Sequence, residues 1–418
     1  MKPLITNDAV LLGLLMAILV LVFHTSHSGR PFFQRFYRYV PPLFLCYFLP
    51  SLFNITWLAG TDYGFRMASG DDSQLYNVAS QYLLPASLVL FTLSIDFPSI
   101  RRLGPKALIM FLTGTAGVIL GGPLAFWLVS LMLPEVTDGE VWRGFTTVAG
   151  SWIGGGANQT AMKEVFEVND KIFSAMIAVD ILTANLWLAF LLYGAGISDR
   201  IDRWLKADAS AVKEVQKRVE DYQARIARIP SFTDLVTVVG LAFICVGIGH
   251  FLADSIAPWI AINAPYLDQF SLTSSFFWVV IIVTTLGLLL SFTPLRELEG
   301  VGASKIGSLL LYVLIATIGL KMDVLAITSN SGLFLVGIIW IFTHISLMIL
   351  VAWLIRAPFF FVAVGSQANI GGAASAPIVA TAFHPSLAPV GVLLAVLGYA
   401  LGTYGAWICG IMLKSIAE

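Results

Sequence analysis

The sequence predicts an all-α polytopic membrane protein, and three observations lead to this fold class. Of the 418 residues, 58% are hydrophobic and 12% are charged, and the mean hydropathy is +0.85, whereas soluble domains carry roughly 25% charged residues. The apolar residues form runs close to the ~20 residues that a membrane-spanning helix needs. A glycine-rich polar stretch also occurs twice within these runs, at residues 150–161 and 365–376.

Composition and motifs limit the function. A net charge of −1 argues against a nucleic-acid partner, which would need a concentrated basic face. The sequence contains no His-Glu-x-x-His, Gly-x-Ser-x-Gly or phosphate-loop motif, so neither an enzyme nor ATP-driven transport is expected. We expect no cofactor, and no metal beyond a coupling Na+. Cys46, Cys245 and Cys409 each lie in an apolar run, where a packed thiol is the usual role.

Each half of the chain contains five predicted spans. The first is a retained helix rather than a signal peptide, because only Lys2 precedes it and no small-residue cleavage site follows it. The spans are 9–23, 39–58, 76–97, 106–133 and 170–195 in the first half, and 231–252, 274–292, 303–325, 332–355 and 386–413 in the second.

A long polar stretch, Asp199–Arg228, carries eight Lys/Arg and six Asp/Glu residues. It divides the chain into transmembrane parts at 1–198 and 231–418, joined by a charged linker at 199–230. Its apolar residues recur every three or four positions, which indicates an amphipathic helix on the protein or membrane surface. A dimerising coiled coil is the alternative. Pro230 ends this helix, because a proline ring cannot continue it.

Basic residues predict the orientation. They concentrate at 30–38, 101–106, 199–228, 296–305 and 356. Placing all of these in the cytoplasm makes the N-terminus external. If both 145–168 and 170–195 crossed the membrane, the basic linker 199–228 would lie outside. The segment 145–168 must therefore enter and leave the membrane on one side. That segment is therefore predicted to be a re-entrant hairpin, with arms of about nine residues that reach roughly half of the ~30 Å hydrocarbon core. A broken helix that crosses fully is the alternative.

This threading makes the two halves inverted repeats, each with five crossings and one hairpin. The halves also share an apolar helix that ends on an acid, at Asp96 in Leu90–Ile100 and at Asp323 in Leu314–Val324. Paired glycine-interrupted segments in two halves of a membrane protein indicate the binding site of a secondary transporter.

The glycine-rich stretches supply the candidate substrate site. A helix broken inside the membrane exposes N–H groups on one arm and carbonyls on the other, which suits an anion beside a cation. We expect Asn158 or Thr160 to cap the returning arm of the first stretch and Ser375 that of the second. Tight packing of small residues is the structural alternative. The candidate substrate-binding residues are Ser151, Gly155, Gly156, Asn158, Gln159, Thr160, Ser366, Gln367, Asn369, Gly371, Gly372 and Ser375.

Asp180 is the main candidate for ion coupling. It lies in the middle of the span 170–195, where an ionisable residue is costly and usually functional. Thr183 and Asn185 follow it and offer oxygen ligands for Na+. A structural, hydrogen-bonded acid is the alternative.

Other polar residues in or beside the spans are weaker candidates. Asp96 and Asp323 lie at span ends, where a charge is ordinary, and we include them as coupling candidates. His250 and His344 lack a second ligand at the spacing of a metal site. We expect both to be packed, hydrogen-bonded imidazoles.

The motifs Gly-Ser-x-x-Gly-Gly-Gly-Ala-Asn-Gln-Thr-Ala and Gly-Ser-x-Ala-Asn-Ile-Gly-Gly resemble the bacterial membrane family catalogued as domain of unknown function 819. That family is grouped with the cation:proton antiporter and anion transporter superfamily, which includes bile acid:sodium, glutamate:sodium and 2-hydroxycarboxylate symporters. The resemblance covers essentially the whole chain. It implies an elevator-type architecture, in which a mobile core moves against a dimerising scaffold, and hence a homodimer in the bacterial inner membrane.

The sequence therefore predicts a secondary-active transporter that couples Na+ or H+ to movement of a small anionic organic solute. A monovalent cation:proton antiporter, with Asp180 exchanging Na+ for H+, is the alternative within this class. A passive channel and an intramembrane enzyme are the alternatives from other classes. The expected partners are the lipid bilayer and the solute, whose identity the sequence does not name.

Overall fold

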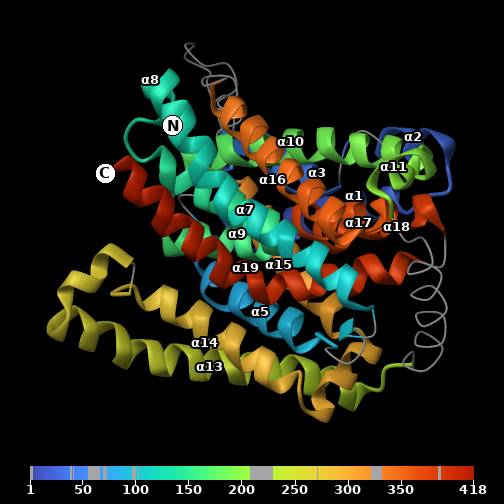
Figure 1. The fold of residues 1–418 in the computed structure, drawn as a ribbon. Helices are drawn as coiled ribbons and strands as arrows, with labels where there is room; N and C mark the ends of the chain where they lie inside the picture. The colour runs from blue at the N-terminus through green and yellow to red at the C-terminus, as the bar shows by residue number, and fades with distance from the viewer. Residues whose placement is uncertain are drawn as a thin grey trace.

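The computed structural model describes most of the chain, and nearly all of the described residues are helical (Figure 1). The candidate coupling residue Asp323 and the linker segment 208–228 lie outside the described residues. The described ranges are 3–37, 40, 42–54, 66–68, 73–96, 100–101, 103–207, 229–270, 272–321, 332–384 and 387–418.

Each half of the chain is a succession of helices, and strand β1 (Pro3–Ile5) pairs in parallel with β2 (Arg66–Ala68). The first half contains α1 (Asp8–Ser26), α2 (Pro31–Tyr37), α3 (Pro42–Asn54), α4 (Leu75–Val78), η1 (Ala79–Leu83), α5 (Leu84–Leu93), α7 (Pro105–Met132), α8 (Pro134–Thr137), α9 (Val141–Val165), α10 (Asp170–Gly196) and α11 (Ser198–Leu205). The second half contains α13 (Phe232–Asn263), η2 (Pro265–Phe270), α14 (Ser275–Leu290), η3 (Pro294–Val301), α15 (Ala303–Gly319), α16 (Gly332–Ile355), α17 (Phe359–Ile370), α18 (Gly372–Phe383) and α19 (Ala388–Ala417).

The predicted spans coincide with helices. Among the described residues, six helices are long and apolar enough to cross a membrane, or up to seven if the bent pair α14–η3 counts as one span. The six are α1, α7, α10, α13, α16 and α19. The other predicted spans coincide with the shorter helical segments α3, α4–α5, α14 and α15. The chain is therefore an all-α integral membrane protein.

A π-helical turn, η1, joins α4 to α5 without interrupting the helix. His250 Nε2 on α13 donates to the carbonyl oxygen of Gln81 in this turn at 2.9 Å. The hydrogen-bonded role predicted for His250 is thus confirmed, and this hydrogen bond joins α13 to η1.

The helices form two groups, and both halves of the chain contribute to each. The first is here named the α13 group. In it, α13 and α14 run side by side along the lower edge of Figure 1 and pack against α5. Helix α15 also packs against α5, and α1, α3 and α4 pack against α15. The second, the α19 group, consists of α7, α9, α10 and α16 to α19. In it, α19 packs against α7 and α9, and α7 also packs against α16.

Small residues allow α7 and α16 to approach closely. A Cβ added to Gly117 would lie 3.0 Å from His344 Nδ1, and one added to Gly121 would lie 2.9 Å from Trp340 Cδ1. Trp340 Nε1 also donates to the carbonyl oxygen of Val118 at 2.8 Å. Glycine at this face therefore seats two large side chains of α16 against the α7 backbone.

Several basic segments meet at one end of the molecule. Lys106 Nζ donates to the carbonyl oxygen of Arg356 at 3.1 Å, and the Phe359 N–H donates to Asp202 of α11 at 2.7 Å. Burial raises the pKa of the Asp202 carboxyl, and the hydrogen bond from Phe359 opposes this shift.

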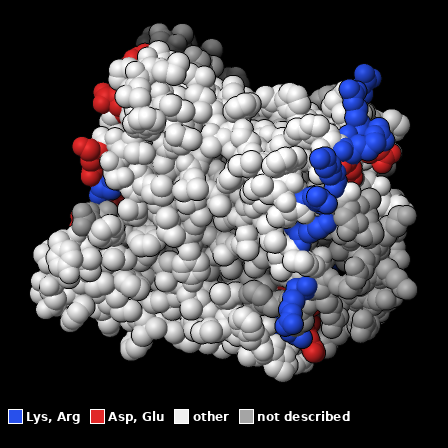
Figure 2. Space-filling model, viewed as in Figure 1, with Lys and Arg blue, Asp and Glu red and all other residues white. Residues whose placement is uncertain are grey.

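The charged side chains gather at two edges of the molecule. Figure 2 shows Lys and Arg toward the right-hand edge of the view, with several Asp and Glu on the opposite edge. Both chain termini lie toward that opposite edge in Figure 1.

Candidate functional site

The first glycine-rich stretch lies in α9, which folds back on itself. Its backbone breaks at Gly155, with φ 73° and ψ −172°, a conformation that glycine adopts most readily. Arg143 Nη1 near the start of α9 donates to the carbonyl oxygen of Phe166, just past its end, at 2.8 Å. The Trp142 and Phe166 ring centroids are 5.9 Å apart.

A straight helix would hold residues 143 and 166 about 35 Å apart. The chain reversal of the predicted hairpin is therefore confirmed. That the hairpin enters and leaves on one side of the membrane stays a prediction. Its arms are residues 141–154 and 156–165, so the first arm is longer than the about nine residues that we predicted and the second is close to that length.

The second stretch forms a corresponding hairpin from α17 and α18. The chain turns between them at Gly371 and Gly372, the latter with φ +57°. Phe383 at the end of α18 lies back beside the start of α17, with its ring centroid 5.3 Å from that of Phe360. Both glycine-rich stretches therefore break a helix and reverse the chain. We refer to α9 as the first hairpin and to α17–α18 as the second.

Helix α19 contacts both hairpins through its glycines. A Cβ on Gly398 would lie 2.6 Å from the carbonyl oxygen of Ile153 in the first hairpin and 3.7 Å from that of Ala368 in the second. A Cβ on Gly402 would lie 2.6 Å from the Cα of Gly154. The two chain reversals therefore meet near the middle of α19, in the interior of the protein.

An asparagine in each hairpin bonds to a neighbouring helix in the same pattern. Thr403 of α19 donates to Asn158 Oδ1 at 2.6 Å, and Asn158 Nδ2 donates to the α19 carbonyl one turn earlier at 3.0 Å. Thr115 of α7 donates to Asn369 Oδ1 at 2.8 Å, and Asn369 Nδ2 donates to the α7 carbonyl one turn earlier at 3.0 Å. Each asparagine thus fixes its hairpin to another helix of the α19 group.

Asp180 on α10 binds both arms of the first hairpin. Ser151 Oγ and Gln159 Nε2 donate to Asp180 Oδ2 at 2.6 and 2.9 Å, and Trp152 Nε1 donates to Oδ1 at 2.7 Å. Asp180 is only 5% exposed. Three neutral donors therefore surround a buried carboxylate at the middle of a span.

Ser366 of the second hairpin joins a chain of hydrogen bonds to α10 and α16. His344 Nδ1 lies 3.0 Å from the carbonyl oxygen of Gly114, so this nitrogen carries the proton, and Nε2 lies 2.8 Å from Ser366 Oγ. A neutral imidazole then accepts at Nε2. Ser366 therefore donates to His344 and accepts from Trp187 Nε1 at 2.8 Å. The packed, hydrogen-bonded role predicted for His344 is confirmed.

The predicted helix caps are wrong. Thr160 Oγ1 donates to the carbonyl oxygens of Gly156 and Ala157, each at 3.0 Å, and Asn158 bonds to α19. In the second hairpin no side chain caps the start of α18, and Ser375 instead accepts from Gln367 Nε2 at 2.6 Å. Each of the three side chains that we expected to cap a helix is bonded to another group instead. The first N–H groups of α18 therefore receive no side-chain cap.

The structure joins Asp180 to a hairpin but places the other described coupling candidates elsewhere. Thr183 packs against α16, with its Oγ1 3.0 Å from the position of a Cβ on Gly337. Asn185 donates to a carbonyl of its own helix at 2.7 Å. Asp96 lies beyond α5 and pairs with Arg296 at 4.0 Å. No contact with Asp180 is among those observed for these three residues in the described ranges.

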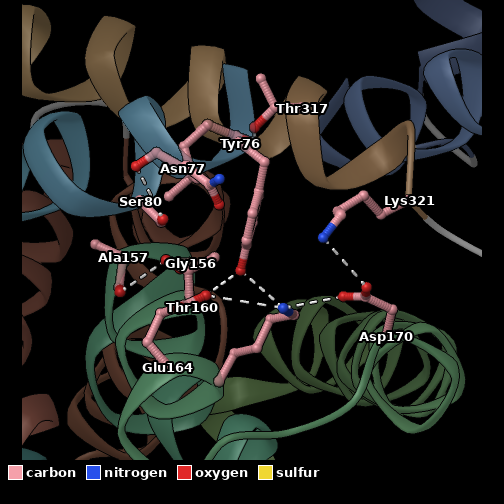
Figure 3. Close-up of polar contacts among 12 residues, drawn as sticks. Tyr76, Asn77, Ser80, Gly156, Ala157, Thr160, Glu164, Asp170, Thr317 and Lys321 are labelled. Atoms are coloured by element: carbon pink, nitrogen blue, oxygen red, sulfur yellow. Dashed lines mark hydrogen bonds and ion pairs between the residues drawn. The ribbon is translucent and has the colours of Figure 1, made fainter. Parts of the chain in front are cut away.

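A charged network beside the first hairpin was missed by the sequence reasoning (Figure 3). Lys163 Nζ lies 2.7 Å from Tyr76 Oη, 3.0 Å from Asp170 Oδ1 and 3.7 Å from Glu164 Oε1. The Tyr76 hydroxyl also donates to Glu164. Lys321 Nζ lies 3.7 Å from Asp170 Oδ2 and 4.5 Å from the centroid of the Tyr76 ring.

This network joins the returning arm of the first hairpin and α10 to α4 and to the end of α15. Lys163 is only 6% exposed. The sequence did contain a signal for this network, namely a lysine within the apolar hairpin segment. A buried charge needs charged or polar partners. The sequence alone did not show which acids would supply them.

No group of three or more His, Cys, Asp or Glu suited to a metal ion occurs in the part of the chain that the structure describes. Cys46, Cys245 and Cys409 are free and buried, as expected for packed thiols. The oxygen atoms gathered at the hairpins are carbonyl, hydroxyl and amide groups together with the carboxylate of Asp180.

Comparison with known proteins agrees with this description. The chain is 25% identical over 348 residues to a Bacillus subtilis (strain 168) protein named "Uncharacterized membrane protein YjcL", an alignment that covers 80% of this chain and 82% of that protein. Residues 13–416 match the family described as "Protein of unknown function (DUF819)". Since this match spans both hairpins, Asp180 and nearly the whole chain, the protein belongs to the DUF819 family.

Proposed function

We propose that this protein is a secondary-active transporter that couples Na+ or H+ to movement of a small anionic organic solute across the bacterial cytoplasmic membrane. The observation that carries the proposal is the meeting of two helical hairpins at Gly398 of α19. Broken backbone at membrane depth is tolerated where it is buried in protein or lines a cavity. Two such breaks at one place are the arrangement that secondary transporters use to bind solute and ion.

The ends of the broken helices offer N–H groups for an anion and carbonyl oxygens for a cation. The first turn of α18 has no side-chain cap, so its N–H groups and positive dipole end suit an anion. The carbonyl oxygens of Ile153 and Ala368 face Gly398 from the ends of the two entering arms. Carbonyls at this negative dipole end, with the Asp180 carboxylate nearby in the same hairpin assembly, suit a cation.

Alternating access by an elevator movement would carry the α19 group, with both hairpins, past the α13 group. The Lys163 network spans the boundary, since Tyr76 and Lys321 belong to the α13 group and Lys163 and Asp170 to the α19 group. Movement would break these ion pairs. In this arrangement the α13 group would supply the scaffold of a homodimer.

Exchange of Na+ for H+ without an organic solute is the second candidate function. The buried Asp180 carboxylate favours it, because its observed partners are three neutral donors rather than a cationic side chain. In this alternative, Asp180 binds Na+ and H+ in turn and the hairpins only enclose the ion.

Purified protein in proteoliposomes distinguishes these functions. Symport predicts no change in luminal pH or solute content until an organic anion is added together with a Na+ or H+ gradient, and then accumulation of that anion. Antiport predicts a luminal pH change when Na+ alone is added. Solute flux that only equilibrates, and that is the same with and without an ion gradient, would identify a passive channel and contradict the proposal.

A further inference from the structure

We propose that a groove between α10 and α16 binds an acyl chain of a membrane phospholipid, and that the bound chain holds Trp187 against the second hairpin. The groove is separate from the hairpin ends that the proposed function assigns to solute and ion. The inference therefore stands whether or not the protein is a transporter.

The groove lies where the two helices run side by side (Figure 1). A pocket of about 250 Å3 opens between them. Both helices supply its walls, and the lining side chains include Thr183, Trp187 and Phe190 of α10 and Ile338, Phe342 and Ile345 of α16.

The position of the groove along the two spans identifies what surrounds it. Its lining residues fall within 183–190 of α10 and 338–345 of α16, near the middle of two helices that are long and apolar enough to cross a membrane. The hydrocarbon core of the bilayer surrounds this part of a spanning helix. Phe190, Ile338 and Phe342 at its rim are each more than half exposed. The groove therefore opens to lipid chains rather than to water.

The chemistry of the lining selects hydrocarbon as the occupant. No charged side chain is among the described residues that line the pocket. The two polar lining groups are engaged elsewhere, since Thr183 Oγ1 lies 3.0 Å from the position of a Cβ on Gly337 and Trp187 Nε1 donates to Ser366. An apolar cavity of about 150 Å3 stays dry and can hold a benzene molecule. This larger groove can therefore hold a segment of an acyl chain.

Trp187 connects the groove to the second hairpin. Its ring lines the groove, and its Nε1 donates to Ser366 Oγ at 2.8 Å. Ser366 Oγ in turn lies 2.8 Å from Nε2 of His344 on α16. Both helices that wall the groove are thus bonded to one serine of the hairpin. A chain packed on the Trp187 ring adds the dispersion contacts that an unfilled groove lacks, and it keeps the indole N–H at Ser366.

Quenching by brominated lipid tests the site on the purified full-length protein in detergent. Bromine on the middle carbons of an acyl chain quenches a tryptophan that the chain touches. Phosphatidylglycerol with brominated chains would be titrated into wild type and Trp187→Phe, and the difference reports on Trp187. Leu120→Trp, compared with wild type, is the matched reference, because Leu120 is 53% exposed near the middle of α7.

Trp187 should be half quenched at a lipid concentration roughly threefold or more below that for the tryptophan at position 120, because a groove offers a chain more contacts than an open helix face. Equal half-quenching concentrations at the two positions would mean that only ordinary lipid contact occurs. That result would overturn the inference.

A filled groove locates the bound chain. Ile345 is half-buried and lines the groove, so Ile345→Phe should abolish the difference between the two positions. Leu350→Phe adds the same ring on an exposed part of α16 outside the groove and should leave the difference intact. Ile338→Phe at the rim serves if Ile345→Phe does not fold. A difference that survives in a folded groove-filling variant would place the lipid elsewhere and overturn the inference.

Two other occupants give different results. Phosphatidylethanolamine with the same brominated chains should quench Trp187 at the same concentration, because the chain rather than the headgroup is bound. Dependence on the headgroup would overturn the acyl-chain assignment. An intermolecular disulfide formed by Phe342→Cys in membranes, together with no quenching of Trp187, would show that a second copy of this chain covers the groove, and would also overturn it.

The connection to the hairpin has its own test. Unbrominated phosphatidylglycerol should raise the thermal midpoint of wild type. It should raise the midpoint of Trp187→Phe by less, since phenylalanine fills part of the same space but cannot donate to Ser366. Leu120→Trp should show the wild-type rise. An equal rise in wild type and Trp187→Phe would separate lipid binding from the hairpin and overturn that part of the inference.

Discussion

Ser151 and Gln159 lie on opposite arms of the first hairpin and donate to the same oxygen, Oδ2 of Asp180. A single carboxylate on α10 therefore holds the two arms in register, and Trp152 completes its shell at Oδ1. The acid is bound to the hairpin that would close on solute or ion. A change of charge or ligation at Asp180 therefore alters a hydrogen bond to each arm.

Asp180→Asn should abolish ion-driven accumulation. The amide keeps one acceptor oxygen, but its NH2 group faces a donor, so at least one buried donor loses its partner at a cost of about 1–3 kcal/mol. We expect a lower thermal midpoint and no further stabilisation by Na+ in the purified variant. The measurement is the Na+ dependence of that midpoint beside the wild type.

Asn185→Ala is the matched control on the same helix, because Asn185 bonds only to its own helix in the described contacts. It should retain the Na+ response. If both variants respond to Na+ like the wild type, Asp180 is a structural acid.

Gly398→Ala should separate the two hairpins from α19. The added methyl would lie 2.6 Å from the carbonyl oxygen of Ile153, so the backbone must shift, and we expect a loss of roughly 1–3 kcal/mol together with loss of transport. Gly240→Ala on α13 is the control, because a Cβ there meets nothing within 4 Å. It should stabilise the protein by roughly 0.5–1 kcal/mol. Thermal unfolding of both variants checks this contrast.

Thr403→Val should loosen the first hairpin without changing side-chain volume. It removes the hydroxyl that donates to Asn158 Oδ1 and should cost about 1–3 kcal/mol, because the acceptor stays buried. Thr237→Val, which removes an exposed hydroxyl bonded to its own helix, should change stability little. Equal effects of the two substitutions in thermal unfolding would show that the Asn158 bond contributes nothing specific.

Lys163→Met should destabilise the boundary between the two helix groups. Glu164 and Asp170 would lose their nearest cation, but their side chains are 20% and 33% exposed. We therefore expect about 1–3 kcal/mol, less than the 3–5 kcal/mol typical of a fully buried pair. Glu164→Gln added to Lys163→Met should restore part of this loss.

Lys171→Met serves as the control for the lysine network, since Lys171 is exposed. Stopped-flow uptake would show whether the weakened network also changes the rate of movement. An unchanged midpoint and rate in Lys163→Met would mean that the network does not connect the groups energetically.

Cysteine labelling tests the orientation. Leu4 in β1 and Ile229 just before α13 are 69% and 94% exposed, and the three native cysteines are buried. An impermeant maleimide applied to intact cells should label Leu4→Cys and leave Ile229→Cys unlabelled until the cells are opened. The reverse pattern would place the N-terminus in the cytoplasm and contradict the positive-inside assignment.

The sequence by itself determined the membrane class, the helical spans and the chain reversal in both hairpins. The membrane class and the spans follow from the length of each apolar run. The chain reversals were predicted from the clusters Gly154–Gly156 and Gly371–Gly372 together with the number of crossings that cytoplasmic basic loops would require. Glycine at those positions weakens a helix and permits positive φ wherever the segment is placed. The repeat relationship and the elevator movement remain predictions.

The tertiary structure alone decided which partner each polar side chain has. Asn158 was expected to cap its own hairpin, yet it bonds to Thr403, 245 residues away, and Lys163 draws Tyr76 and Asp170 into one network. A buried polar group must be satisfied by whichever donor or acceptor the docked helices bring within about 3 Å. That choice depends on the packing of α7, α10 and α19 around the hairpins, which no local pattern of residues encodes.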